Sequence, residues 1–490
     1  MKEVRIFDFL LDKKHSKAVA YEFGNKTFSF NEIYNLTIKT ANILLSKGIK
    51  PKDNIALLFD NSPEFILSVL ASDFLCLRII PINTKLSKEQ TLQILEELKP
   101  KFLLTNLSIQ LTSTYTELIH LDLETIREGY LKQVDIKKCS PDEPFLISTT
   151  SGSTSKPKPI VLSTSTKIKR AFETVIDLYK VKDEDVLIVS TPMYHTLGFR
   201  LSLIPIYSGC KAVIIEKFEP QDWLYTVSIK KVSLSILVSS QIRSILPYIR
   251  KGEYDLSSLR CLVSSSSSLS GVEKEEILNL LSCDFHEMYG TSETSTVSDI
   301  NLREFRAKIE SVGYPLKNVE VAIIDEQGNR LKPKEVGEIA VRTPLIFSGY
   351  LNMEQETKRA FLGDYFLTGD LGYMDEDGFL YYKGRKKFLY KVGAINVFPE
   401  DVESVILSYN GIKECAVVGV QEGGETKLIA FYSAEDEIRE SELRKFCFQK
   451  LASYQVPYRF IQLEELPKNH VGKIDRRALE VYLLGVSKND

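Results

Sequence analysis

The sequence has no excess of charge of either sign. Lys and Arg total 63 and Asp and Glu total 66 among 490 residues, so the formal net charge is −3. Binding to nucleic acid or to an anionic membrane normally depends on a strongly positive surface. We therefore expect a small molecule, and not nucleic acid, as the main ligand.

Regular cysteine spacing is also missing. None of the seven cysteines belongs to a CxxC pair; they are Cys76, Cys139, Cys210, Cys261, Cys283, Cys415 and Cys447. Zinc sites and disulfide frameworks usually show such spacing, so the sequence predicts neither. An odd, dispersed set is typical of a reducing compartment, and the predicted location is cytoplasmic.

Long apolar runs are absent as well. Charged residues interrupt the first segment, Met1–Lys13, so it does not resemble a signal peptide. The most hydrophobic stretch, Phe65–Ile82, contains Asp73 and Arg78, which favours a buried helix followed by a strand over a membrane anchor. The single tryptophan, Trp223, is expected in the core.

What is present is typical of a large globular α/β protein. Hydrophobic residues make up 43% and charged residues 26%, and the length predicts at least two domains. From about residue 30 to about residue 300, apolar runs alternate with amphipathic segments, as in helices laid over a mainly parallel sheet. Ser87 and Gln90, for example, predict a helix that ends at Leu98, followed by a strand over Lys101–Thr105.

The pattern changes in the last third of the chain. Between Gly313 and Tyr382, short apolar runs are separated by turns such as Asp325–Gly328, which predicts a small antiparallel β unit. A small β barrel is one form that this unit could take. A charged run follows Gly384, and helix and strand patterns then alternate on a smaller scale. We expect a hinge there and a small α+β C-terminal domain.

The first chemical motif is the hydroxyl-rich segment Thr149–Lys158, which follows a predicted strand. Its candidate phosphate-binding residues are Thr150, Ser151, Gly152, Ser153, Thr154 and Lys158. Backbone amides, hydroxyls and a lysine in a tight turn can surround a polyphosphate. The Walker pattern is absent, and a mobile Ser/Thr linker is the alternative interpretation.

A second motif, Tyr289–Glu293, follows another predicted strand, at the edge where open parallel sheets usually bind ligands. Gly290 would let the backbone approach a ligand closely, and Ser292 could donate to a phosphate oxygen. The carboxylate of Glu293 could hold the Mg²⁺ that accompanies ATP. The alternative is an ordinary turn with an exposed glutamate.

Two further segments contain charged residues next to glycine. Asp370, in Thr368–Asp370, could accept hydrogen bonds from both ribose hydroxyls, and Arg385 could contact ribose or phosphate. Lys473 lies in a glycine turn within Pro467–Arg476. Taken singly, these segments fit a common turn and a solvated lysine equally well.

Together, the four motifs resemble those of the adenylate-forming superfamily, which includes acyl- and aryl-CoA synthetases, firefly luciferase and peptide-synthetase adenylation domains. The matched patterns are [ST]SG[ST]TGxPKG, YGxTE, TGD, GR and PxxxxGK, in this order over nearly the whole chain. Pro192–Gly198, which contains His195, and Gly337–Ile339 are similar to further family segments. The run Ser264–Leu269 stands where relatives have Ser-Gly-Gly-Ala-Pro-Leu.

The resemblance implies a fold, a reaction and a role for each motif. A large AMP-binding domain over residues 1–384, with stacked α/β sheets and a small β barrel, would precede a mobile lid at 385–490, with the hinge near Lys387. A carboxylic acid would attack the α-phosphorus of MgATP, and the acyl-adenylate would then react with a thiol. CoA is the expected acceptor, and the phosphopantetheine of an acyl carrier protein is the alternative.

The same resemblance assigns the site residues. Ser292 would contact the α-phosphate, Lys473 would bridge the substrate carboxylate and the α-phosphate, and His195 would gate or line the acid pocket. Tyr289, Gly290 and Ser266 would line the nucleotide pocket. Glu293 would hold the metal.

The chain also departs from the family pattern. Ser155 and Pro159 replace glycines of the phosphate loop, Ser265 and Ser266 replace a glycine pair, and Ala394 stands at a hinge glycine. These losses leave open a degenerate nucleotide-binding relative without ligase activity. The Phe-Asp-x-Ser stretch of peptide synthetases has no counterpart beside His195, which favours an acid without an α-amino group.

Overall fold

The computed structural model describes residues 4–109, 111, 113–132, 139–149, 158–393, 395–422, 425–468 and 474–486. The chain divides into two compact units. Unit 1 comprises Met1–Ser267, Leu278–Val297 and Thr343–Arg359, and unit 2 comprises Ser268–Ile277, Ser298–Arg342 and Ala360–Asp490. This division does not test the predicted domain boundary after Gly384, which stays a prediction.

The first sheet of unit 1 is mainly parallel, as the alternating pattern predicts. Seven of its nine strands follow the order β13-β12-β11-β9-β10-β1-β2, and only the edge pair β1–β2 in this series is antiparallel. The strands are β1 (Val19–Phe23), β2 (Lys26–Ser29), β9 (Val186–Val189), β10 (Lys211–Ile214), β11 (Leu234–Val238), β12 (Cys261–Ser265) and β13 (Asp284–Thr291). The next strand after β13 is β14 (Ser295–Asn301).

The second sheet of unit 1 has the order β18-β8-β7-β4-β3-β5-β6. Strands β3 to β7 pair in parallel, whereas β8 pairs antiparallel with β7 and with β18. The strands are β3 (Asn54–Leu58), β4 (Arg78–Pro81), β5 (Phe102–Thr105), β6 (Glu117–His120), β7 (Pro144–Thr149), β8 (Pro159–Ser163) and β18 (Gly349–Tyr350). Pro159 is tolerated because it opens its strand.

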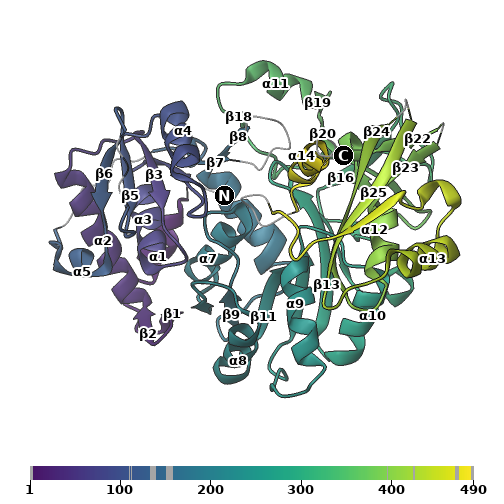
Figure 1. The fold of residues 1–490 in the computed structure, drawn as a ribbon. Helices are drawn as coiled ribbons and strands as arrows, with labels where there is room; N and C mark the ends of the chain where they lie inside the picture. The colour runs from purple at the N-terminus through teal and green to yellow at the C-terminus, as the bar shows by residue number, and fades with distance from the viewer. Residues whose placement is uncertain are drawn as a thin grey trace. The chain divides into compact units, whose positions relative to one another are not determined.

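Helices cover both sheets of unit 1. They are α1 (Ile6–Asp12), α2 (Phe30–Ser46), α3 (Pro63–Phe74), α4 (Lys88–Leu98), α5 (Leu123–Glu128), α6 (Thr164–Ala171), α7 (Thr196–Ser208), α8 (Pro220–Lys230), α9 (Ser239–Ile249) and α11 (Glu354–Arg359). Helix α3 contacts α1 and α2, which lie beside it in Figure 1. The capping box of Ser87 and Gln90 starts α4 as predicted, and Trp223 of α8 is fully buried.

Unit 2 contains the predicted antiparallel sheet, with the order β16-β17-β20-β19 and with β21 paired to β20. Its strands are β16 (Glu320–Ile324), β17 (Gly337–Arg342), β19 (Phe361–Leu362), β20 (Tyr365–Met374) and β21 (Leu380–Arg385). The short strand β15 (Tyr314–Pro315) pairs with β14. Helix α10 (Gly271–Leu280) precedes β13 in the sequence.

The last part of unit 2 is a small α+β arrangement. A hairpin of β22 (Tyr390–Val392) and β23 (Ile395–Val397) precedes a sheet of β24 (Ile412–Glu422), β25 (Glu425–Ala434) and β26 (Arg459–Gln462). Helices α12 (Pro399–Leu407) and α13 (Glu440–Lys450) contribute to the core on one face of this sheet, and α14 (Arg476–Val486) to the core on the other (Figure 1). Val417 and Val418 of β24 face opposite cores, as strand alternation requires.

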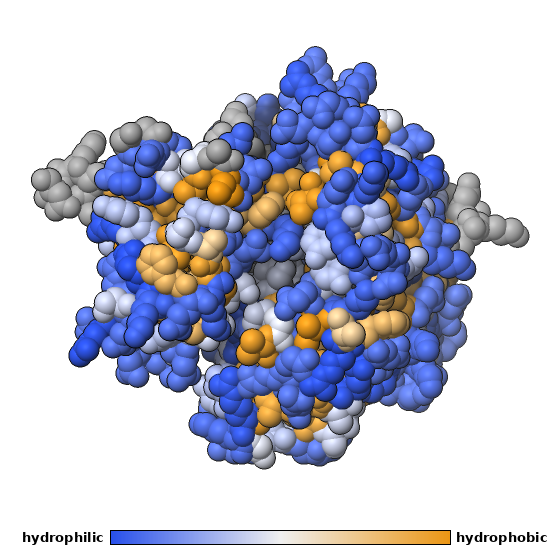
Figure 2. Space-filling view, turned by 90° about the vertical axis from the view of Figure 1, so that its right-hand side faces the viewer, coloured by the Kyte–Doolittle hydropathy of each residue, from blue (hydrophilic) through white to orange (hydrophobic). Residues whose placement is uncertain are grey.

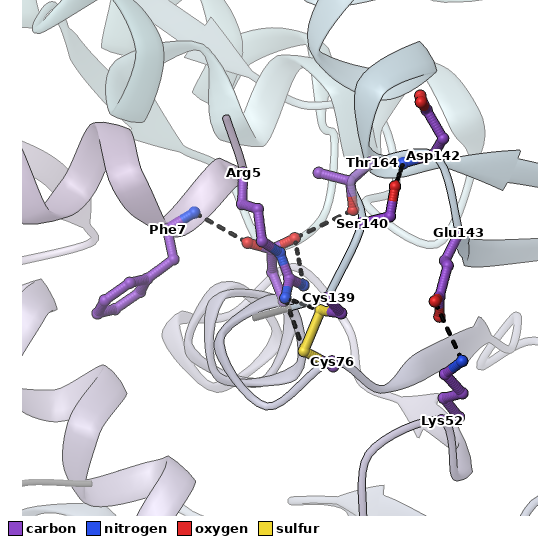
Figure 3. The surroundings of a disulfide bond; sticks show 10 residues. Arg5, Phe7, Lys52, Cys76, Cys139, Ser140, Asp142, Glu143 and Thr164 are labelled. Atoms are coloured by element: carbon purple, nitrogen blue, oxygen red, sulfur yellow. Dashed lines mark hydrogen bonds and ion pairs between the residues drawn. A yellow bond between two sulfur atoms is a disulfide. The ribbon is translucent and has the colours of Figure 1, made fainter. Parts of the chain in front are cut away.

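The prediction that no cysteines pair is wrong, because Cys76 and Cys139 form a disulfide. Figure 3 shows it beside Arg5, whose guanidinium contacts both sulfurs and forms an ion pair with the buried Asp73 at 3.2 Å. Spacing could not reveal a pair 63 residues apart, since only the fold brings the two cysteines together. The prediction of a reducing compartment loses the support that it drew from unpaired cysteines.

Hydrophilic residues dominate the face in Figure 2, and apolar residues are scattered between them. In the part of the chain that the structure describes, no helix is both long enough and apolar enough to cross a membrane. The interpretation of Phe65–Ile82 as a buried helix followed by a strand is confirmed by α3 and β4.

Candidate functional site

The candidate site of unit 1 lies where parallel strands end. Strands β12 and β13 are adjacent and parallel, so the serine run that begins at Ser264 and the motif Tyr289–Glu293 come from the same edge of the sheet. This carboxyl edge is where open α/β sheets usually hold their ligands. The fold therefore brings two of the predicted nucleotide segments together.

A tight turn carries Ser292 and Glu293 between β13 and β14. Thr291 and Thr294 close the turn reciprocally, since the backbone amide of each donates to the other's hydroxyl at 3.2 Å. Both Ser292 and Glu293 remain partly exposed. The turn thus presents a hydroxyl and a carboxylate from a short, hydrogen-bonded frame.

The neighbouring backbone explains why a glycine stands at Gly290. A Cβ atom at this position would lie 2.0 Å from the carbonyl oxygen of Ser295, so β14 leaves no room for a side chain. The predicted close approach of a ligand is not needed to explain this glycine.

Glu293 is held by groups that sequence reasoning missed. The Tyr350 hydroxyl donates to Glu293 Oε1 at 3.1 Å, and the Phe347 amide donates to the Glu293 carbonyl at 2.8 Å. The Lys158 ammonium lies 5.2 Å from the centre of the Tyr350 ring. Because β18 pairs with β8, Tyr350 connects the end of the phosphate segment to the predicted metal ligand.

Arg170 of α6 is the second missed residue. Its guanidinium donates to the carbonyl oxygens of Ser292 and Glu293 at 2.9 and 2.6 Å. It is buried, and burial lowers its pKa to about 9, so it remains charged at neutral pH. No motif signals such a residue, because a basic position on an amphipathic helix usually indicates an exposed face.

The donor set fits a nucleotide-bound magnesium ion better than a resident metal. Among the described residues, no three His, Cys, Asp or Glu side chains gather in a way that could hold a metal. Mg²⁺ usually takes one or two protein carboxylates and completes its shell with substrate phosphates and water. One partly exposed carboxylate, that of Glu293, meets this requirement.

Ser266 has a left-handed backbone, with φ of +76°. It follows β12 and is exposed, and its hydroxyl lies 3.3 Å from that of Ser265. Such a φ favours glycine. A serine therefore adopts here a conformation that favours glycine.

His195 stands at the N-terminus of α7, where its ring packs edge to face against Tyr194 at 4.6 Å between centroids. The side chain is only partly buried. Gly198 is sterically required, since a Cβ there would lie 2.1 Å from the Pro192 carbonyl oxygen. The segment Pro192–Gly198 is thus a compact turn that leaves His195 partly accessible.

In unit 2, Asp370 and Arg385 are direct cross-strand neighbours on β20 and β21. Arg385 Nε lies 2.7 Å from Asp370 Oδ1, and Asp370 is 2% exposed. A carboxylate has about four acceptor positions, so this ion pair leaves capacity for other donors. The structure brings the two predicted ribose-binding residues together, in a contact that the sequence did not predict.

Several predicted residues lie outside the described residues. These are Thr150, Ser151, Gly152, Ser153 and Thr154 of the phosphate segment, and Lys473. Their predicted roles stay predictions. Lys387, at the predicted hinge, lies in a short 3₁₀ turn, and burial together with Arg385 lowers its pKa to about 8.

Comparison with known families accounts for most of the chain. The AMP-binding enzyme family matches residues 11–351, and the AMP-binding enzyme C-terminal domain matches residues 401–473. Among similar proteins, the 2-succinylbenzoate–CoA ligase of Bacillus licheniformis is 30% identical over 464 residues, which cover 93% of this chain and 95% of the relative. The corresponding ligase of Bacillus subtilis is 27% identical and covers 94% of each chain.

Solved structures resemble the chain over nearly its full length. The o-succinylbenzoate CoA synthetase (MenE) of Bacillus subtilis, in complex with the acyl-adenylate intermediate OSB-AMP, has a TM-score of 0.89 at 26% identity, with 98% of each chain covered. ATP-bound MatB from Rhodopseudomonas palustris has a TM-score of 0.88 at 25% identity and the same coverage. From the matched family, the full-length relatives and the site geometry together, we conclude that this chain belongs to the AMP-binding enzyme family, within the adenylate-forming superfamily.

Proposed function

We propose that the chain activates 2-succinylbenzoate, or an aromatic acid close to it, with ATP and transfers the acyl group to CoA. The reaction class is ATP-dependent ligation of an acid to CoA through an acyl-adenylate. The identity of the acid is the proposed part. It is supported by one observation, the 30% identity to a 2-succinylbenzoate–CoA ligase over nearly the whole of both chains.

The proposed chemistry has two displacements. A carboxylate oxygen of the acid attacks the α-phosphorus of ATP and pyrophosphate leaves; the thiol sulfur of CoA then attacks the acyl carbon and AMP leaves. Negative charge builds up at the α-phosphate in the first step, so positioned donors and cations carry most of the catalysis.

Each predicted residue then has a defined task. Glu293 holds the magnesium ion that shields the phosphates, and Ser292 donates to the α-phosphate from the turn after β13. Asp370 accepts from the ribose hydroxyls while it is paired with Arg385. Lys473 and the phosphate segment at 150–154 supply charge and donors, as the motif resemblance implies.

Carrier-protein loading and a degenerate relative without ligase activity are the two alternative functions. Loading of an acyl carrier protein finds no support among the similar proteins, whose names specify CoA ligases. A degenerate relative was suggested by the lost glycines, yet Ser266 adopts the backbone angle that favours glycine, and Pro159 fits the start of β8. Neither replacement disrupts the local fold.

An ATP–pyrophosphate exchange assay across a panel of acids tests the proposal. We expect 2-succinylbenzoate to exceed benzoate and succinate by roughly 100-fold in kcat/KM, because each analogue lacks half of the acid. Lys473→Ala serves as the inactive control. A higher rate with an unrelated acid, or no exchange with any acid, would contradict the proposal; adding CoA or holo-carrier protein then identifies the acceptor.

A further inference from the structure

Three positively charged side chains are buried on helices α6 and α7. Lys167, Arg170 and Arg200 are 2%, 3% and 8% exposed. Within the described part of the chain, no carboxylate forms an ion pair with any of them, although Glu293 is close enough to Arg170 to influence its pKa. Buried charges are costly unless hydrogen bonds compensate them.

The hydrogen bonds of the Arg170 guanidinium all go to main-chain carbonyl groups. Its Nη1 and Nη2 donate to the carbonyls of Ser292 and Glu293 at 2.9 and 2.6 Å, and its Nε donates to the carbonyl of Leu345 at 2.8 Å. The planar fork of a guanidinium spreads its donors over three nitrogens in fixed directions, whereas the three donors of an ammonium lie on a single nitrogen. Arg170 therefore ties the turn after β13 to the segment that leads into β18.

The same segment also holds the Glu293 side chain. Leu345 lies five residues before Tyr350, whose hydroxyl donates to Glu293 Oε1 at 3.1 Å, and the Phe347 amide shares the Glu293 carbonyl with Arg170. Arg170 thus fixes the main chain at Ser292 and Glu293 and also the segment that orients the carboxylate.

Arg200 restrains the far side of the turn. Its Nη1 contacts the hydroxyls of Thr174, Ser295 and Thr296, and the Thr174 hydroxyl donates to the Arg170 carbonyl at 2.6 Å. Ser295 has φ of +67°, an unfavourable angle for serine that surrounding contacts must maintain. The turn is consequently held in one conformation by both arginines.

We infer that Arg170 is a positioning residue, which fixes Ser292 and Glu293 so that the hydroxyl meets the α-phosphate and the carboxylate meets magnesium. The inference rests on the proposed function for the identity of these ligands. Arg170 touches neither substrate nor metal and acts only through the turn. A shift of about 1 Å at a catalytic group can cost on the order of 10²-fold in rate.

The test compares Arg170→Met and Arg170→Lys with Lys167→Met. Lys167 is equally buried on the same helix but contacts the ring of Phe199, at 4.2 Å, and no part of the turn. We expect Arg170→Met to lower the exchange kcat about 100-fold and to raise the magnesium concentration needed for half-maximal rate. Arg170→Lys should fall between Arg170→Met and the wild type, and Lys167→Met should match the wild type.

A second readout separates this inference from the proposed function. Titration of each folded variant with a fluorescent ATP analogue, at several magnesium concentrations and without any acid, reports the metal dependence of nucleotide binding alone. Suppose that the wild type shows no pyrophosphate exchange with any acid, but that Arg170→Lys still needs more magnesium than the wild type for nucleotide binding. The proposed function then fails and the inference about Arg170 stands. An unchanged magnesium dependence in both Arg170 variants, or an equal loss in Lys167→Met, would overturn the inference.

Discussion

Ser266 shows at the scale of one residue how a substitution can preserve a backbone at an energetic cost. Its φ of +76° lies in the left-handed region, where any residue with a Cβ is disfavoured by roughly 1 kcal/mol. Because Ser266 is exposed, either a serine or a glycine fits at this position. The chain therefore has a hydroxyl group at the end of β12 at the cost of a less favourable backbone conformation.

Replacing Ser266 with glycine should accordingly stabilise the protein. We expect Ser266→Gly to raise the free energy of unfolding by about 0.5–1 kcal/mol, and Ser266→Ala, which keeps the Cβ and loses the hydroxyl, to give no such gain. Thermal unfolding of the two variants side by side measures the difference. Equal stabilities would show that the backbone angle costs nothing here.

Glu400 has one buried carboxyl oxygen, Oε2, beside Gly384, although its side chain as a whole is 27% exposed. A Cβ at Gly384 would lie 2.4 Å from Glu400 Oε2, which has no hydrogen-bond partner among the described residues. Arg476 lies 3.7 Å from Glu400 Oε1 but is engaged more closely by Glu403. Burial, followed by repulsion from Glu403, raises the pKa of Glu400 to about 7.

This raised pKa predicts a pH-dependent stability with a definite sign. A carboxyl group with a higher pKa in the folded state favours folding when protonated, so its contribution is lost as the pH rises from 4.5 through about 7. At about 1.4 kcal/mol per pKa unit, the loss is at most about 3.5 kcal/mol. We expect Glu400→Gln to have a higher Tm than the wild type at pH 8 and nearly the same Tm at pH 4.5.

Thermal unfolding of Glu400→Gln and of the wild type at pH 4.5 and at pH 8 measures this difference in Tm. Asp401→Asn should move the change toward lower pH, since the Asp401 carboxylate, which pairs with Lys383, also raises the pKa of Glu400. A difference between Glu400→Gln and wild type that stayed constant from pH 4.5 to pH 8 would contradict the assigned titration.

Strand β18 consists of two residues, yet it links two chemical motifs at the scale of secondary structure. Its pairing with β8 places Tyr350 opposite Ile160, two residues beyond Lys158, while the Tyr350 hydroxyl reaches Glu293. The ring beneath the Lys158 ammonium adds a cation–π contact. Strand β18 thus joins the predicted phosphate segment to the predicted metal ligand, Glu293.

Two substitutions separate the contributions of Tyr350. Tyr350→Phe removes only the hydrogen bond to Glu293 and should raise the magnesium concentration needed for half-maximal exchange by about 10- to 100-fold, the effect of one lost hydrogen bond to a charged group. Tyr350→Leu also removes the ring and should raise the KM for ATP further. Identical kinetics for the two variants would assign no role to the ring.

Sequence patterns predicted the elements well where local physics decides them. The capping box at Ser87 and Gln90 gave the start of α4, and the apolar runs gave the parallel strands that end at Ser265 and Thr291. The motifs also selected Glu293, Asp370 and Arg385, whose roles stay predictions. These features depend on neighbours in the sequence or on chemistry that few residue types can provide.

Contacts between distant segments could not be predicted in the same way. Arg170 and Tyr350 are 122 and 57 residues from the turn residues that they hold. A buried arginine in a helix and a tyrosine in a two-residue strand have no distinguishing local pattern. Gly290 was predicted as a ligand-binding glycine, whereas the atom that requires a glycine there is the carbonyl oxygen of Ser295.

At the scale of the whole molecule, the disulfide is the main long-range covalent constraint in the described residues. It closes a segment of 63 residues, which in the chain-entropy model stabilises the folded state by about 4 kcal/mol. The five other cysteines, all buried, are free thiols. The oxidised protein should therefore behave differently from the reduced protein.

Thiol counting and thermal unfolding check this state directly. Denatured without reductant, the protein should titrate five thiols of its seven cysteines, and seven after reduction. We expect Cys76→Ser with Cys139→Ser to lower the Tm by several degrees under oxidising conditions. Cys210→Ser is the control and should leave the effect of reductant on the Tm unchanged; seven thiols before reduction would refute the pairing.

The position of the disulfide in the chain also affects how the protein is made. Arg5, Asp73, Cys76 and Cys139 all leave the ribosome before Lys158 and before every other residue of the nucleotide site. Since N-terminal segments generally fold first during synthesis, this crosslink can close while Tyr289–Glu293, Asp370 and Arg385 are still untranslated. The order of translation would then give the later segments a covalently fixed template on which to assemble.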